Sequence, residues 1–391
     1  MAEEQMDLVA GRSGMPKVPS VLEGVKTAAD WQARRRRILG YLEEEMYGRI
    51  PPRPERMSFS VDWEKPVFDG LGICRQVNMR FGVKDRELEL KALWYLPAKG
   101  DRVPCVCALN FCGNAGTSFD PDIYQPASEA DKERGWQVRR WSYQYLLEQG
   151  ISCLTAARND FFPDSEVGRY GSVFRLFHKE AELTPEHREY TAISAWAWGY
   201  SRLLDLALTD PRIDERRVWV HGHSRLGKTA LWVGAHDLRF AGVVSNDSGC
   251  CGASIERDHH ANAENLERIT RTFHRWFVTK FDQWVNRADE MPFDMNWLVS
   301  LTAPRPVLIA SASEDVWADP FNEFRCAKQV GEVYRLFGAH GLPDDAQFPA
   351  PNEAVIGDRV AYELREGKHD VTPRDWEVLV EFMKSLEKQA K

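Results

Sequence analysis

Short runs of apolar residues recur along the chain, separated by segments with helical periodicity. These runs, which are typical of strands covered on both faces, lie at residues 106–109, 151–155, 218–220, 242–244 and 307–310. Residues 88–92 instead alternate apolar and polar, as a half-exposed strand does, so we expect the sheet to begin antiparallel and to become parallel. Between the runs, Ile193, Trp196 and Tyr200 share one helix face. The pattern predicts an α/β fold with a mostly parallel central sheet flanked by helices on both faces.

Helices are also expected at the two ends of the chain. A basic run at residues 34–37 follows Trp31 in an amphipathic pattern that ends at Tyr47. We expect this run to form a solvated helix face. The last helix is predicted to begin at Thr372, because this capping hydroxyl is followed by Pro373 at the first helical position.

Two connections are longer than a compact sheet needs, at residues 112–137 and 248–298. Long loops at the carboxyl ends of parallel strands tend to build the functional site. The middle of the chain has no Pro/Gly/Ser-rich or low-complexity linker between domains. We therefore predict a single domain over residues 1–391, with an N-terminal helical extension at about 1–50 and a long insertion at about 248–298.

Residues 218–230 (VWVHGHSRLGKTA) are predicted to form a strand, a sharp turn and a helix. This order is typical of a nucleophile elbow, in which a serine at the tip of a strained turn precedes a helix whose positive end faces the developing oxyanion. Ser224 has the position of the nucleophile, and Gly222 that of the small residue before it. Gly227 comes three residues after the serine, so the general G-x-S-x-G pattern is not met. The arrangement nevertheless indicates an α/β-hydrolase fold.

The same letters also fit a phosphate-binding loop. Residues 222–229 satisfy the G-x-x-x-x-G-K-[ST] pattern between a strand and a helix. Against this alternative, residues 223–226 are bulky where a loop around phosphate needs small side chains, and the next strand turns polar before Asp247. Nucleotide binding would be detected as a rise in melting temperature with ATP or GTP and Mg²⁺.

A nucleophilic serine needs a base, and in this fold the histidine comes last along the chain. His369 precedes the terminal helix, where the last strand would end near the nucleophile. Two acids compete to orient it: Asp247 follows the strand at 242–244, and Asp315 follows the strand at 307–310, which is the commoner position for this fold. The remaining histidines near the turn and in the insertion, for which packing or surface roles are expected, are His221, His223, His259 and His260.

Composition narrows the classes of ligand. The formal net charge of −8, with one short basic run, argues against general affinity for nucleic acid or for an anionic membrane. The eight cysteines form no paired C-x-x-C motifs, so we expect no metal site, and several lie in strand-like runs where a buried thiol is the default. No apolar stretch has the length of a membrane span, and the first four residues, MAEE, lack the pattern of a signal peptide.

In detail, these motifs resemble the glucuronoyl esterases, a carbohydrate esterase family that cleaves the ester between glucuronic acid side groups of xylan and lignin alcohols. The most specific part is the G-x-S-R-x-G-K form at residues 222–228, which also accounts for the displaced glycine. The other matching segments are MYG at 46–48, LNFCGN at 109–114, SNDSG at 245–249, APRP at 303–306 and EDVWADP at 314–320.

By position, the resemblance implies that Ser224 is the nucleophile and His369 the base. It implies that Arg225 lies beside the oxyanion, a role that suits a guanidinium because it stays charged and has fixed donors. The fungal members have Glu at the position of Asp247, so the shorter side chain leaves open whether Asp247, Asp315 or both orient the base.

The resemblance also implies a sugar site. Lys228 and Glu264 match positions that hold the sugar hydroxyls, and Trp317 resembles an aromatic residue that lines the sugar pocket. One cation, one carboxylate and one flat apolar face suit a pyranose ring with its hydroxyls. Disulfide pairing stays open, because the adjacent Cys250 and Cys251 cannot easily close a relaxed bridge.

We therefore predict a cofactor-free serine esterase that acts through an acyl-enzyme on a glucuronate ester of xylan or of a lignin–carbohydrate complex. One alternative is a general acetyl or aryl esterase on the same fold. Another is a catalytically silent carbohydrate-binding homologue, which should have lost Ser224 or His369. By resemblance, a polymeric wall substrate implies secretion or the periplasm, and the sequence leaves the oligomeric state and the preferred alcohol open.

Overall fold

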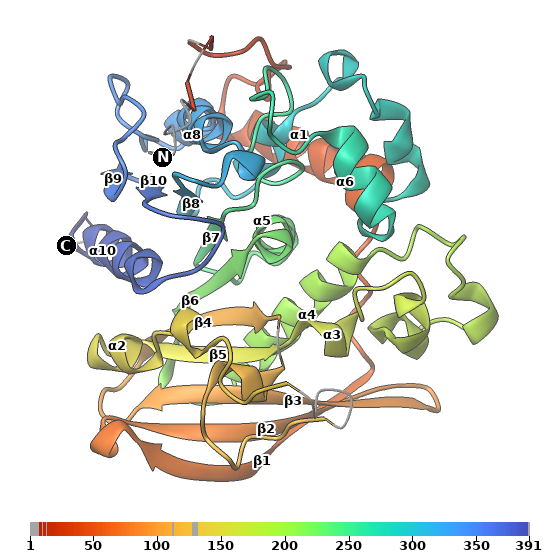
Figure 1. The fold of residues 1–391 in the computed structure, drawn as a ribbon, viewed down its shortest axis with the longest axis vertical. Helices are drawn as coiled ribbons and strands as arrows, with labels where there is room; N and C mark the ends of the chain where they lie inside the picture. The colour runs from red at the N-terminus through yellow and green to blue at the C-terminus, as the bar shows by residue number, and fades with distance from the viewer. Residues whose placement is uncertain (1–7, 10, 13, 112, 127–131, 390–391) are drawn as a thin grey trace, which may run out of the picture.

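A ten-stranded sheet forms the centre of the computed structural model, which describes residues 8–9, 11–12, 14–111, 113–126 and 132–389. Cys112 and the first four residues, for which predictions were made above, lie outside these residues. The strands are β1 Arg56–Val67, β2 Gly72–Val83, β3 Arg86–Pro97, β4 Val103–Asn110, β5 Ser152–Ala157, β6 Ile213–His223, β7 Gly242–Asn246, β8 Val307–Ala312, β9 Glu353–Ile356 and β10 Val360–Arg365. Their order across the sheet is β1-β2-β3-β5-β4-β6-β7-β8-β10-β9, from the bottom of Figure 1 to its top.

The sheet changes from antiparallel to parallel, as the sequence predicts. β1, β2, β3 and β5 pair antiparallel, every neighbouring pair from β5 through β4 to β10 is parallel, and β9 closes the far edge antiparallel to β10. β1, β2 and β9 were not identified from the sequence, and the last strand, β10, was expected before His369 without bounds. In β1 most exposed positions are polar, and in β2 the polar residues Arg75, Gln76, Asn78 and Arg80 interrupt the apolar ones, which weakens the apolar signal of a strand.

Helices cover both faces of the sheet and enclose a hydrophobic core on each. The helices are α1 Ala28–Leu42, α2 Tyr143–Glu148, α3 Arg158–Phe161, α4 Ala192–Ala207, α5 Arg225–His236, α6 Leu266–Phe273, α7 Met295–Ser300, α8 Pro320–Gln329, α9 Gly331–Arg335 and α10 Pro373–Gln389. Cys105 and Cys107 of β4 face the core that contains α1, α4, α5 and α8. Val106, between them, faces the core that contains α2 and α10, so β4 is covered on both sides.

The α/β-hydrolase fold with its mostly parallel sheet is confirmed, and the last helix begins at Pro373 as predicted. The basic run of α1 departs from the predicted solvated face at Arg35, whereas Arg36 and Arg37 are exposed. Arg35 is 8% exposed and donates to the carbonyl oxygens of Leu301 and Ala235, which belong to distant parts of the chain. The division into one domain with an extension and an insertion stays a prediction. Among the described residues, the helices include none that is long and apolar enough to cross a membrane.

Four neighbouring strands deliver the predicted site residues to one edge of the sheet. Ser224 directly follows β6, and Asp247 directly follows β7. Asp315 comes shortly after β8, and His369 shortly after β10. Because these strands are parallel, their carboxyl ends meet at the same edge.

Candidate active site

The turn that carries Ser224 has the backbone of a nucleophile elbow. Ser224 has φ 57° and ψ −128°, a conformation that is strained for a residue with a side chain. Its amide donates to the carbonyl oxygen of Asn246 over 2.8 Å, which ties the elbow to β7. A Cβ atom at Gly222 would lie 1.8 Å from the carbonyl oxygen of Leu226, so only glycine permits this close approach of strand and helix.

All eight residues that the sequence and the resemblance nominate line one cavity of about 360 Å³. These residues are Ser224, Arg225, Lys228, Asp247, Glu264, Asp315, Trp317 and His369. Ser248, Gly249, Phe273, Trp276 and Ala318 complete the lining. The roles of these residues stay predictions, but segments far apart in the sequence converge here.

His369 and Asp315 form a close pair at the cavity. Nδ1 of His369 lies 2.5 Å from Oδ2 of Asp315, whose side chain is 4% exposed, whereas the His369 side chain is 41% exposed. Because a carboxylate accepts, Nδ1–H of His369 donates to it. This tautomer leaves Nε2 free to accept a proton.

Asp247 has other partners. Its Oδ2 lies 3.4 Å from Nη2 of Arg365 and accepts from the amide of Asp370 over 3.3 Å. Burial raises the pKa of Asp247 well above its ordinary value, and the negative charge of Asp315 raises it further. Among the described residues, these contacts pair Asp247 with Arg365 and leave Asp315 as the acid bonded to His369.

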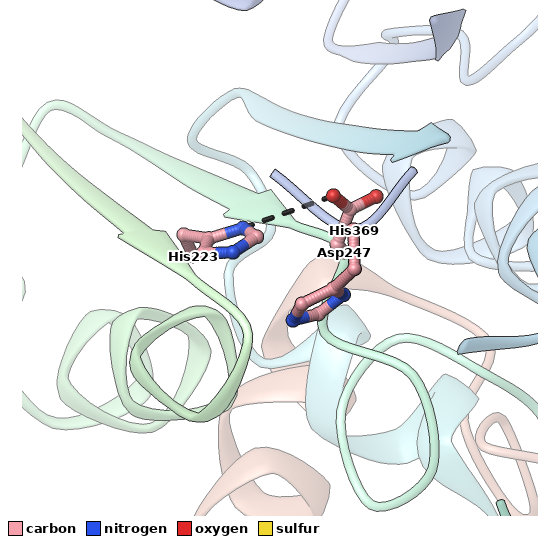
Figure 2. A group of neighbouring side chains, drawn as sticks. All are labelled: His223, Asp247 and His369. Carbon is pink, nitrogen blue, oxygen red and sulfur yellow. Dashed lines mark ion pairs between the residues drawn. The ribbon is translucent and has the colours of Figure 1, made fainter. Parts of the chain in front are cut away.

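His223 was assigned a packing or surface role from the sequence, and the structure buries it against the predicted base. Its ring centroid lies 4.5 Å from that of His369. Its Nδ1 lies 2.5 Å from Oδ1 of Asn246 and 3.8 Å from Oδ2 of Asp247, the contact marked by the dashed line in Figure 2. The sequence held one indication that His223 belongs to the site, namely its position directly before the predicted nucleophile.

Arg225 is oriented by acidic and aromatic neighbours. Its guanidinium forms an ion pair with Asp164 and lies 4.6 Å from the ring centroid of Trp276. Burial opposes the ionisation of Asp164, but Arg158, Arg225 and Arg275 together lower its pKa. The Asp164 carboxylate therefore stays ionised and holds Arg225 at the wall of the cavity.

Lys228, Glu264 and Trp317 supply a cation, a carboxyl group and an aromatic face. Lys228 is 4% exposed and its Nζ donates to the carbonyl oxygen of Ser248. Burial raises the pKa of Glu264, and the charge of Lys228 opposes that rise. Trp317 is 50% exposed, so its ring is available at the surface of the cavity. The amide of Glu264 donates to the carbonyl oxygen of Trp317 over 2.9 Å, which keeps the two residues together.

Comparison with known proteins identifies the family of this chain. A family model described as "Glucuronyl esterase, fungi" matches residues 115–338. Carbohydrate esterase MZ0003, from an unknown prokaryotic organism, is 37% identical over 386 residues, which cover 94% of this chain and 88% of that protein. The chain belongs to the glucuronoyl esterase family. The resemblance inferred from the sequence motifs is thereby confirmed.

Other members of the glucuronoyl esterase family agree in sequence and in fold. The 4-O-methyl-glucuronoyl methylesterase of Schizophyllum commune is 26% identical over 337 residues, covering 83% of this chain and 72% of that one. The solved structure of a glucuronoyl esterase from Solibacter usitatus is 35% identical and superposes with a TM-score of 0.86, covering 95% of this chain and 98% of the other. The likeness therefore extends over nearly the whole of both chains.

Family membership and charge both disfavour the phosphate-loop alternative. The Lys228 ammonium, which would face phosphate in such a loop, shares its cavity with Asp247, Glu264 and Asp315. Carboxylates in the same cavity, when ionised, repel a polyphosphate.

In the part of the chain that the structure describes, two groups of side chains offer donor atoms of the kind that bind metals. The donor atoms of His223, Asp247 and His369 lie within 4.8 Å of one another, but Arg365 already supplies a positive charge to Asp247. Nδ1 of His369 is also engaged with Asp315.

The second group contains Cys250, Cys251 and Glu256. Cys250 donates to Oε2 of Glu256 over 3.1 Å, and burial raises the pKa of its thiol well above the ordinary value, which disfavours the thiolate that a metal needs. The Sγ atoms of the adjacent cysteines lie 3.8 Å apart as free thiols. The seven described cysteines are all buried free thiols.

Proposed function

We propose that this glucuronoyl esterase family member hydrolyses esters of glucuronic acid through Ser224 and His369, with Asp315 orienting the base. One observation carries the proposal: the strained serine, the His369–Asp315 pair and the three sugar-site residues line a single cavity. The arrangement supports acyl transfer because it combines a nucleophile, an oriented base and a fixed cation near the reacting carbonyl.

The reaction runs in two steps. Oγ of Ser224 attacks the ester carbonyl carbon while Nε2 of His369 accepts the hydroxyl proton. The Arg225 guanidinium and the amide at the start of α5 stabilise the negative charge that develops on the carbonyl oxygen. The bond to the alcohol breaks, and His369 returns its proton to the departing oxygen. Water, deprotonated in turn by His369, then attacks the acyl carbon of the acyl-enzyme. The bond from that carbon to Oγ of Ser224 breaks, and His369 returns the proton to Oγ, which releases the uronic acid and the free serine.

The sugar is the acyl part of such an ester, so it stays in the cavity through both steps. Lys228 and Glu264 would bind its hydroxyls, and Trp317 would lie against the ring. Relatives named 4-O-methyl-glucuronoyl methylesterase support this substrate class. The polymer that bears the sugar is proposed to be xylan, with lignin alcohols as leaving groups, and such a wall substrate favours secretion or the periplasm.

A rate comparison tests the proposal. The specificity constants kcat/KM are measured for benzyl glucuronate and for 4-nitrophenyl acetate with the same enzyme preparation. We expect the glucuronate ester to be the better substrate, because its sugar gains contacts that the acetate lacks. A higher constant for the acetate would favour a general esterase.

A further inference from the structure

A buried histidine touches the proposed base in a way that the mechanism above does not use. His223 is the last residue of β6, directly before Ser224, and it is 5% exposed. Its ring plane and that of His369 differ by 41°, with the centroids 4.5 Å apart. In Figure 2 the two rings lie side by side, and they come from separate segments of the chain.

A hydrogen bond fixes the His223 ring independently of His369. Nδ1 of His223 lies 2.5 Å from Oδ1 of Asn246, and Nδ2 of Asn246 donates to Asp375 over 2.7 Å. Because the amide oxygen only accepts, Nδ1 of His223 carries the hydrogen. β7 and the start of α10 therefore hold this ring, which presents a fixed surface to His369.

The groups around His223 favour its neutral form. Burial lowers the pKa of His223 well below its ordinary value, and the charges of His369 and Arg140 lower it further. Asp247, with Oδ2 at 3.8 Å, would favour a charged ring, but Arg365 shares that carboxylate at 3.4 Å. A neutral ring can pack against His369 in both of its protonation states, whereas a charged one would repel the imidazolium.

We propose that His223 is a positioning residue whose neutral ring holds the His369 imidazole between Asp315 and the hydroxyl of Ser224. The inference rests on the roles proposed above for Ser224 and His369. One backbone segment then carries both the nucleophile and the surface against which the base packs. The distance between the two reacting groups is thereby set locally, at the elbow itself.

Two substitutions at His223 distinguish the effect of its aromatic ring from the effect of its hydrogen bond to Asn246. His223→Phe keeps an aromatic face against His369 and loses the donor to Asn246, whereas His223→Gln keeps a donor and loses the ring. We expect kcat of the Phe variant to stay within about threefold of the wild type and kcat of the Gln variant to fall by roughly tenfold to a hundredfold, as for a misplaced catalytic group. KM should stay nearly constant, because His223 is not among the residues that line the sugar cavity.

His221 provides the matched control. It lies two residues earlier on β6, is also 5% exposed, and stacks on Trp376 with the ring centroids 4.5 Å apart. His221→Phe and His221→Gln should alter Tm and leave kcat near that of the wild type. A spectroscopic readout accompanies the rates: the downfield proton resonance of Nδ1–H in His369 should persist in His223→Phe and broaden in His223→Gln.

The proposal is overturned if His223→Gln keeps the wild-type kcat, if the Phe variant loses as much as the Gln variant, or if His221→Gln loses as much as His223→Gln. His223→Leu, which fills the space without an aromatic face, replaces the Gln variant if that one does not fold. Rates are measured on both the glucuronate ester and the aryl acetate, because the base serves both. A wild type active only on the acetate would contradict the proposed substrate and leave this comparison intact.

Discussion

Oδ2 of Asp315 lies 2.5 Å from Nδ1 of His369, whereas Oδ2 of Asp247 lies 3.4 Å from Nη2 of Arg365. Each aspartate follows a neighbouring strand, yet only the first is bonded to the proposed base among the described residues. Asp315→Asn should therefore lower kcat by up to about 10⁴-fold, because an amide favours the wrong tautomer of the histidine. Asp247→Asn should cost far less.

The comparison of these two variants is made with steady-state kinetics on benzyl glucuronate, after circular dichroism has shown that both are folded. Asp247→Asn is the matched control, since it makes the same chemical change in the same cavity. A larger loss of kcat for Asp247→Asn than for Asp315→Asn would reverse the assignment of the orienting acid.

Ser224→Ala should abolish the reaction while leaving the fold intact. The hydroxyl is the nucleophile proposed at the elbow, and its removal in comparable enzymes lowers kcat by about a millionfold. The strained turn is held by the backbone bond to Asn246, which alanine keeps. The rate is measured with contaminating esterase excluded, and Tm is measured alongside. A loss smaller than about tenfold would show that another group is the nucleophile.

Substitutions in the sugar site should affect substrates unequally. Lys228→Met and Glu264→Ala each remove a hydrogen bond that involves a charged group and contributes about 1.5–3 kcal/mol, so kcat/KM for the glucuronate ester should fall by roughly tenfold to a hundredfold. The aryl acetate has no hydroxyls to bind, so its turnover should barely change.

Lys280→Met serves as control for the sugar site, because this half-exposed lysine pairs with Glu44 outside the cavity. It should leave both substrates unaffected. Equal losses on both substrates for the Lys228 and Glu264 variants would mean that these residues support the fold or the catalytic residues Ser224, His369 and Asp315 instead.

Glu323 should make the stability of the fold depend on pH. It is fully buried, and burial raises its pKa from 4.5 to about 7 even though Ser311, Gly249 and Ser248 donate to its carboxylate. Since the folded-state pKa is the higher one, its stabilising contribution is complete below pH 4.5 and is lost as the pH rises through 7. The difference corresponds to roughly 3 kcal/mol.

Urea unfolding at a series of pH values measures this effect, with Glu323→Gln as the comparison. The Gln variant cannot ionise, so its free energy of unfolding should decline less between pH 4.5 and 7 than that of the wild type. Parallel curves for the two proteins over this range would exclude Glu323 as the group responsible.

Much of this molecule could be predicted from local patterns in its sequence. Apolar runs identified five of the ten strands, β4 to β8, and an alternating pattern identified β3. The order of strand, turn and helix around Ser224 predicted the α/β-hydrolase fold, because a nucleophile elbow is formed by one short, continuous segment of the chain. The capping pattern at Thr372 predicted the start of α10. The elbow, the chain order of the fold and the family resemblance together nominated eight of the thirteen residues that line the cavity.

Contacts between distant segments could not be predicted in this way. The carbonyl groups that bind Arg35 come from residues far along the chain, so the basic run was taken for a solvated face. β1 and β2 were missed because polar residues interrupt their apolar positions, and their pairing with each other, not their composition, makes them strands.

The sequence by itself determined which chemical groups this protein has and on which elements they lie, because periodicity, capping and the elbow act over a few neighbouring residues. Tertiary structure alone decided which of two similar aspartates bonds to His369, since both follow parallel strands at one edge and differ only in where their side chains lie. It also brought His223 against His369, from a strand and a loop far apart in sequence. Such choices depend on packing over a few ångströms across the sheet edge, a scale at which sequence periodicity carries no information.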